Sequence, residues 1–117
     1  MGAEARLAEL GIQLPEPMRA PPGFEVKWRQ VLMVGDRAVI AGHGPRTADG
    51  TLPQTLGKLG IELAVEQGYE AARMTGLGIL ADLRAELGDL DRIIRWVRVF
   101  GMVNSATGFN QQPRVMN

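Results

Sequence analysis

Residues 92–103, RIIRWVRVFGMV, constrain the fold of this chain more than any other stretch, because their pattern predicts a strand that is apolar on both faces. One face carries Ile93, Val97 and Val99, and the other carries Ile94, Trp96, Phe100 and Met102. Such a strand needs cover on both sides. A single layer of helices covers only one side, so the pattern predicts that the second side meets another subunit.

Residues 65–87 predict the covering helix. Apolar residues recur there at steps of three and four, at Val65, Tyr69, Ala72, Gly76, Ile79, Leu80, Leu83 and Leu87. This places Tyr69 in the core and Glu66, Glu70, Arg73, Asp82 and Glu86 largely outside the apolar stripe. Gly68, Ala72 and Gly76 predict a smooth groove for close packing on a sheet, and Gly88 predicts the end of the helix.

Turn signals organise the rest of the chain. Two apolar runs between Lys27 and Ala41 flank Gly35–Asp36, which predicts a hairpin, and residues 47–51 predict a tight turn. Residues 3–11 predict a short helix, followed by a proline-rich loop. We therefore expect an N-terminal arm over residues 1–26 and one α+β domain over residues 27–117. Pro113 suits the first turn of a second helix, so the order is β-β-α-β plus a helix start, a domain that looks C-terminally incomplete.

Composition excludes several function classes. The 117 residues suffice for one domain, and 13 basic residues balance 13 acidic ones, which disfavours binding to nucleic acid. The chain has no cysteine, one histidine and one serine, and no metal-ligand spacing, so we expect neither a metal nor a covalent nucleophile nor a cofactor. It shows no signal peptide and no membrane-spanning run, so we expect a soluble cytoplasmic protein without a membrane partner.

The glycine turn in AVIAGHGPRTADGT, residues 38–51, is not a phosphate-binding loop. The third glycine of a dinucleotide fingerprint would fall at Thr47, and the later LGKLG has no hydroxyl residue after Lys58. The turn either lines a carboxylate-binding cleft through its backbone or merely ends a strand.

The chain resembles the RidA (YjgF, endoribonuclease L-PSP) family, in one of its less characterised branches. The resemblance runs from about Trp28 to Asn117 and is carried by VIAGHGPRTADGT (39–51), by EQGYEAARMTGLGILADLRAELGDLDRIIRWVRVFGMVNS (66–105) and by GFNQQPRVMN (108–117). It implies a chorismate-mutase-like α+β sheet with helices on one face, assembled as a homotrimer with clefts between subunits. It also implies hydrolysis of enamine and imine acids to 2-keto acids and ammonia.

Four site residues follow from the resemblance. Trp28 stands at an aromatic position facing the cleft, and Gly42 at the glycine whose backbone approaches the ligand. His43 replaces a common glutamine, and Asn117 matches an asparagine that reaches the cleft from the neighbouring subunit. No catalytic residue is assigned, because the family's carboxylate-binding arginine lies beyond Asn117. The nearest candidate, Arg114, is expected to face solvent.

Each of these residues also has a simpler interpretation. His43 is either a proton shuttle or a solvated turn residue, and Trp28 is either a stacking platform or packing. Arg95 and Arg98 fall on opposite faces of the predicted strand, which suits pairing with carboxylates better than ligand binding. Two functions remain open: an imine deaminase, and a non-catalytic trimer that binds small carboxylates or a protein. The family's older name suggests a ribonuclease, which the neutral charge disfavours.

Overall fold

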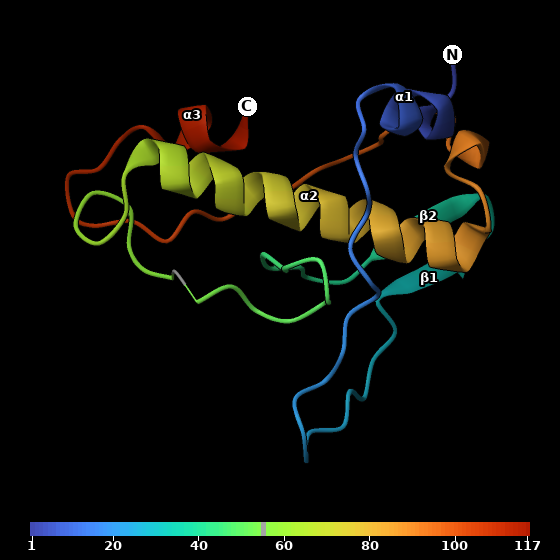
Figure 1. Ribbon diagram of the computed structural model, residues 1–117, viewed down its shortest axis with the longest axis horizontal. Helices are drawn as coiled ribbons and strands as arrows, with labels where there is room; N and C mark the ends of the chain where they lie inside the picture. The colour runs from blue at the N-terminus through green and yellow to red at the C-terminus, as the bar shows by residue number, and fades with distance from the viewer. Residues whose placement is uncertain (55) are drawn as a thin grey trace.

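The computed structural model describes residues 1–54 and 56–117 and contains one long helix with a short hairpin beside it. In chain order the elements are α1 (Ala3–Glu9), β1 (Val31–Val34), β2 (Arg37–Ile40), α2 (Val65–Leu87), the 3-10 helix η1 (Leu90–Arg92) and α3 (Gln112–Met116). In Figure 1, α1 and the hairpin lie near the C-terminal end of α2, whereas α3 lies at its N-terminal end.

Helix α2 has the limits that the sequence predicts. At its start, the side chain of Gln67 accepts a hydrogen bond from the backbone N–H of Ala64, with 2.8 Å between Oε1 and N. At its end, Gly88 adopts the left-handed conformation with φ 82°, and its N–H donates to the Arg84 carbonyl at 2.8 Å. A residue with a side chain is strained at such a φ, so glycine is favoured at this helix end.

The predicted hairpin is also confirmed. β1 and β2 pair antiparallel, with Val31 opposite Ile40 and Val34 opposite Arg37. The two-residue turn between them needs a positive φ, which Gly35 supplies at 61°. Val31 is buried on the side of the hairpin that faces α2, whereas Leu32 is exposed on the other side.

The predicted turn at residues 47–51 closes around Asp49. The hydroxyl groups of Thr47 and Thr51 each donate to Asp49 Oδ1 at 2.6 Å, and the Thr51 N–H donates to the same oxygen at 3.1 Å. These hydrogen bonds, that of the Thr47 hydroxyl first, lower the pKa of Asp49 to about 2. Gly50 supplies the positive φ of 83° that completes the turn.

The core consists of two clusters, one at each end of α2. The first contains Val31, Leu83 and Leu90, with Leu7, Leu14, Ala38, Ile40, Ile79, Leu80, Leu87 and Ile93 packed around them. The second contains Leu59, Leu63 and Val115, with Val65, Ala72, Val103 and Phe109 around them. Helix α2 joins the two clusters because it supplies residues to both.

The N-terminal helix is attached to the first cluster. Leu7 on α1 packs against that cluster, and so does Leu14 in the loop that follows. The backbone N–H of Glu4 donates to Asp91 Oδ1 at 3.0 Å, which ties the start of α1 to η1. The predicted helix over residues 3–11 is confirmed in its main part, and Gly11 leaves it with φ 64°.

The prediction of a strand over residues 92–103 is wrong in this structure. Arg92 ends η1, and residues 93–104 are assigned to no strand. The expected cover is also missing within the described residues, since Ile94 is 97% exposed and Val97 and Phe100 are exposed as well. The physical reason is that no other described strand lies against this segment, and a strand exists only through hydrogen bonds to a neighbour.

Two predictions on the face of α2 also need correction. Tyr69, expected in the core, is 47% exposed, and Gly76, expected in a close-packed groove, has open space where a Cβ would stand. Gly68 does pack closely, because a Cβ there would come within 2.6 Å of Leu59 Cδ1. Helix α2 therefore buries a face rotated from the predicted stripe.

The radius of gyration, 15.2 Å, exceeds the value of about 13.4 Å expected for a closed domain of this length, which agrees with the exposed segment. No described helix is both long and apolar enough to cross a lipid bilayer. At the C-terminal end of the chain, Pro113 stands in the first turn of α3, as predicted.

Candidate functional site

The turn that follows β2 presents unpaired backbone amides on the surface. The N–H of Ala41 donates to the Gln30 carbonyl at 2.9 Å, which is the last hydrogen bond of the hairpin. After it, Gly42 and Gly44 are exposed, and nothing lies within 4 Å of a Cβ placed on either residue. No backbone carbonyl of the described residues accepts a hydrogen bond from the amides of residues 42–44. The amides of residues 42–44 therefore have no backbone partner among the described residues, and the two glycines are exposed.

Between the two glycines, the His43 side chain turns inward and is only 2% exposed. Its Nδ1 lies 2.7 Å from the Ala41 carbonyl oxygen, and its Nε2 lies 2.8 Å from Asp82 Oδ2. A carbonyl oxygen and a carboxylate oxygen can only accept hydrogen bonds. Both contacts are satisfied if both ring nitrogens carry a proton. They are also satisfied if only Nδ1 carries one and the Asp82 carboxyl donates its own proton to Nε2. Of the two interpretations of His43, the solvated turn residue is wrong, because the side chain is buried against Asp82.

Asp82 also attracts a second cation, Arg46. Nη1 of Arg46 lies 3.2 Å from Asp82 Oδ2, and Nη2 donates to the Gly78 carbonyl at 2.6 Å. The side chains of Arg46 and Asp82 are each 5% exposed. Gly78 makes room for this arrangement, because a Cβ there would stand 2.8 Å from Arg46 Nη2. Nε and Nη1 of Arg46 have no hydrogen-bond partner among the described residues.

The His43–Asp82–Arg46 cluster places positive charge beneath the free amides. Arg46 contributes the positive charge, and Asp82 Oδ2 contacts both Arg46 and His43. Arg46 keeps its charge under all ordinary conditions. Backbone N–H groups above a buried positive charge form a site that attracts a small anion, for which a carboxylate is suited. The three buried side chains position the turn and contribute to the electrostatic field around it, but they are too deep to touch a ligand.

The structure brings Trp28, Gly42 and His43 to the same end of the hairpin. Continuing the register of β1 and β2 beyond the Ala41–Gln30 bond places Trp28 opposite His43. The Trp28 side chain is 51% exposed and meets Phe24 edge-on, with ring centroids 6.4 Å apart. Trp28 therefore lies outside the core and is accessible to a ligand at this end of the hairpin.

Asn117 does not join them within this chain. It follows α3, which packs through Val115 against the second core cluster. Ala72 of that cluster and Asp82 are ten helical residues apart on α2, which corresponds to about 15 Å. Arg114 is exposed, as predicted, and its Nη1 donates to Gln111 Oε1 at 2.8 Å.

The sequence reasoning did not identify Arg46 and Asp82 as site residues. Asp82 was placed outside the apolar stripe of the helix, but it is buried. One signal was present: Gly78 and Asp82 are four residues apart, so on a helix they share a face. No similar signal in the sequence connects Arg46 with that face. No group of three or more histidine, aspartate or glutamate side chains in the described ranges is arranged to hold a metal ion.

Comparison with known proteins identifies relatives. No family model matches the chain. Protein TCP17 of Trypanosoma cruzi is 35% identical over 113 residues, which are 97% of this chain and 67% of that protein.

Two crystal structures have similar folds. A candidate endoribonuclease of Shewanella oneidensis matches 99% of this chain and 73% of its own length, with a TM-score of 0.84 and 29% identity. A protein of unknown function from Agrobacterium tumefaciens matches 97% of this chain and 66% of its own length, with a TM-score of 0.76 and 30% identity.

Proposed function

This chain belongs to the family of protein TCP17 and has a RidA-like α+β fold, and we propose that it hydrolyses small enamine or imine acids. In this proposal the amides of residues 42–44 hold the substrate carboxylate, above the charge of the His43–Asp82–Arg46 cluster. The observation that carries the proposal is this set of exposed, unpaired amides over a buried cation. The proposed setting is the cytoplasm, where pyridoxal-phosphate enzymes release such acids.

The proposed reaction adds water to a carbon that is already electrophilic. The oxygen of water bonds to the imine carbon, the carbon–nitrogen bond breaks, and the products are a 2-keto acid and ammonia, with the protons of water moving to nitrogen. The protein's part is to hold the carboxylate and orient the imine carbon toward water. Trp28 is proposed to cover the substrate at the end of the hairpin, and Asn117 is proposed to reach the site from a neighbouring subunit.

A homotrimer is part of the proposal. Leu32, Val34 and Val39 are exposed on the face of the hairpin turned away from α2, and Phe100 and Met102 are exposed on the segment that runs beside α2. An apolar surface of this extent is typical of a protein interface. Sedimentation velocity should give three times the chain mass. A Phe100→Glu variant should sediment as a smaller species, whereas Ile61→Glu, which changes an exposed apolar residue elsewhere, should not.

The test of the site is substitution at Gly42. The structure has room for a valine there, so Gly42→Val should fold normally while its side chain covers the amides. We expect its affinity for 2-ketobutyrate in calorimetry, and its rate on 2-iminopropanoate, to fall at least tenfold. Ala20→Val, which also enlarges a small residue and lies in an exposed loop, should change neither. Unchanged binding by Gly42→Val would show that the turn is not the site.

The same assays separate the proposal from its alternative, a trimer that binds small carboxylates without turning them over. Binding of 2-ketobutyrate without release of ammonia from 2-iminopropanoate would favour the binding module. An endoribonuclease activity, the description given to the Shewanella protein, is not proposed for this chain, because its 13 basic residues are balanced by 13 acidic ones.

A further inference from the structure

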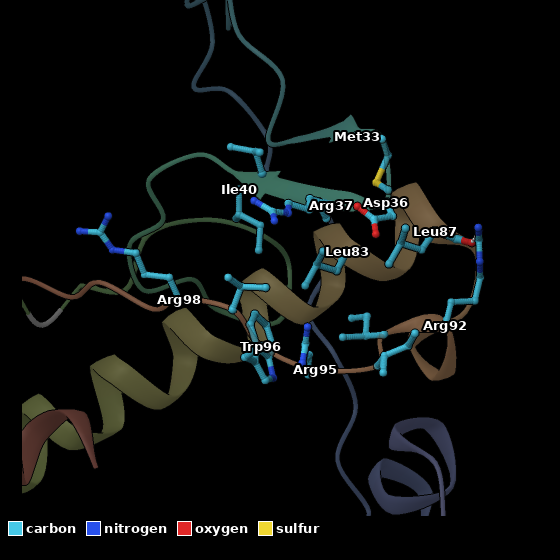
Figure 2. Close-up of a pocket in the computed structure, with 16 residues that line it drawn as sticks. Met33, Asp36, Arg37, Ile40, Leu83, Leu87, Arg92, Arg95, Trp96 and Arg98 are labelled. Carbon is cyan, nitrogen blue, oxygen red and sulfur yellow. Dashed lines mark hydrogen bonds between the residues drawn. The ribbon is translucent and has the colours of Figure 1, made fainter.

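A small cavity of about 230 Å³ lies between the start of β1 and the C-terminal half of α2. It shares no lining residue with the larger groove of about 1050 Å³ between β2 and residues 93–98, which Figure 2 shows. The larger groove has the form of an open strand position in this chain's own sheet. Drug-sized ligands occupy pockets of about 300–1000 Å³, so the small cavity suits a smaller molecule.

The buried side chain of Asp82 lines the small cavity and is only 5% exposed. Its Oδ2 is the oxygen that contacts both His43 Nε2, at 2.8 Å, and Arg46 Nη1, at 3.2 Å. Its Oδ1 accepts no hydrogen bond from any described residue. Because Oδ2 is turned toward His43 and Arg46, Oδ1 is the oxygen that remains for the cavity.

Gln30 supplies a second acceptor to the same cavity. Its Oε1 is buried, and no donor in the described part of the chain reaches it. The Nε2 of the same amide is directed to Met18 Sδ, 3.5 Å away. Buried acceptors are rarely left without a hydrogen bond in native proteins. An acceptor of this kind beside a cavity therefore points to a donor that enters the cavity.

Two exposed side chains of opposite charge, Glu86 and Arg29, complete the polar lining. Glu86 follows Asp82 by four residues, so the two carboxylates share one face of α2. Neither Glu86 nor Arg29 takes part in an ion pair between described residues. The rest of the lining is apolar and comes from Val31 and Ala85. The cavity therefore combines three acceptor side chains with one guanidinium.

Three acceptors match the three N–H donors of a primary ammonium group, and a guanidinium matches a carboxylate. An α-amino acid carries both groups on one carbon. We propose that this cavity binds a free α-amino acid with a small side chain. Its ammonium group donates to Asp82 Oδ1, Gln30 Oε1 and Glu86, and its carboxylate pairs with Arg29. This site is distinct from the turn at residues 42–44, because its lining includes none of those residues.

The test is an NMR titration of the isotope-labelled full chain with L-alanine, in a buffer that contains no amine. We expect saturable shifts at the amides of residues 29–31 and 82–86. Propanoate, which lacks the ammonium group, and ethylamine, which lacks the carboxylate, should each bind about tenfold more weakly or worse. Shifts confined to residues 42–44 would overturn the proposal, because alanine would then bind at the turn through its carboxylate. The absence of saturable shifts would also overturn it and leave the cavity to water.

Protein variants locate the site. Glu86→Gln and Gln30→Met should each weaken alanine binding about fivefold or more, because each removes a partner of the ammonium group. Glu70→Gln, a matched change at an exposed acid on the same helix, should change it less than about twofold. Circular dichroism confirms that the variants fold. Equal binding by Glu86→Gln and Gln30→Met would overturn the proposal.

Two more variants separate the alternatives. Arg29→Gln should weaken binding of alanine and leave binding of ethylamine unchanged, because only alanine brings a carboxylate. Stronger binding of alanine by Arg29→Gln would show that Arg29 itself occupies the acceptors, which would overturn the proposal. Gly42→Val should bind alanine as the unmodified chain does. The assay contains neither an imine nor a 2-keto acid, so its outcome is independent of the proposed hydrolysis.

Discussion

Replacing Asp82 by asparagine tests whether the buried cluster beneath the turn holds this part of the fold together. Asp82 Oδ2 lies 2.8 Å from Nε2 of His43 and 3.2 Å from Nη1 of Arg46, and all three side chains are at most 5% exposed. An asparagine occupies nearly the same volume, so the substitution removes the charge and leaves the packing. Any loss of stability then reports on electrostatics.

The magnitude follows from burial. Removing one partner of a buried ion pair costs about 3–5 kcal/mol, because the remaining charge is left without compensation. Arg46 cannot escape this cost, because its guanidinium stays charged. At about 2.1 cal/mol/K per residue, a chain of this length unfolds with an entropy of about 0.25 kcal/mol/K. A loss of 3–5 kcal/mol therefore lowers the Tm by about 12–20 °C.

The assay is urea unfolding followed by circular dichroism, with the free energy of unfolding taken from the midpoint and slope. Glu70→Gln is the matched control, because Glu70 is an exposed acid on the same helix whose nearest cation is 3.5 Å away. It should change the free energy of unfolding by less than about 0.5 kcal/mol. Adding Arg46→Met to Asp82→Asn should cost much less than the sum of the two single changes. A loss below about 1 kcal/mol for Asp82→Asn, or strict additivity, would refute the reasoning.

Three further predictions concern α2 and the turn before it. Gly78→Ala should displace the guanidinium of Arg46 and lower the free energy of unfolding by about 1–2 kcal/mol. Gly76→Ala should raise it by about 0.5–1 kcal/mol, because a Cβ at Gly76 stands in open space. Equal effects of the two substitutions in urea unfolding would contradict the close approach at Gly78. Leu83→Ala should lower it by about 2–5 kcal/mol, since Leu83 is 1% exposed in the first cluster, and a calorimetric loss under 1 kcal/mol would be incompatible with that burial. The pKa of Asp49 is lowered to about 2 by the neighbouring threonine hydroxyls, so Asp49 should stabilise the fold above pH 3.8, the ordinary pKa of an aspartate. This contribution should disappear as the pH falls through 2. Asp49→Asn should lack this component of the pH dependence, and an NMR titration near 3.8 would contradict it.

Local chemistry explains why α2 and the hairpin could be predicted. The three- and four-residue period over residues 65–87 and the glycine at residue 88 act within one or two turns of chain. Gly35 likewise determines its turn through its own φ. These features depend on near neighbours in the sequence, so the sequence alone was sufficient to place them.

Features that depend on distant neighbours were not predictable in the same way. The apolar pattern of residues 92–103 favours extended chain, but a strand needs a partner, and whether one is present is a property of the tertiary structure. Tyr69 satisfies the helical period and is nevertheless exposed, because packing decides which side of α2 is buried.

The candidate site shows the same division. The sequence by itself indicated that the turn at Gly42 and His43 follows a strand and offers its backbone. Only the tertiary structure brought Asp82 and Arg46 beneath it. His43 and its partner Asp82 are 39 residues apart in the sequence, and Arg46 and its partner Gly78 are 32 residues apart. The physical reason is that a buried charge is stable only beside its counter-charge, and the chain acquires that neighbour only when the hairpin packs on α2.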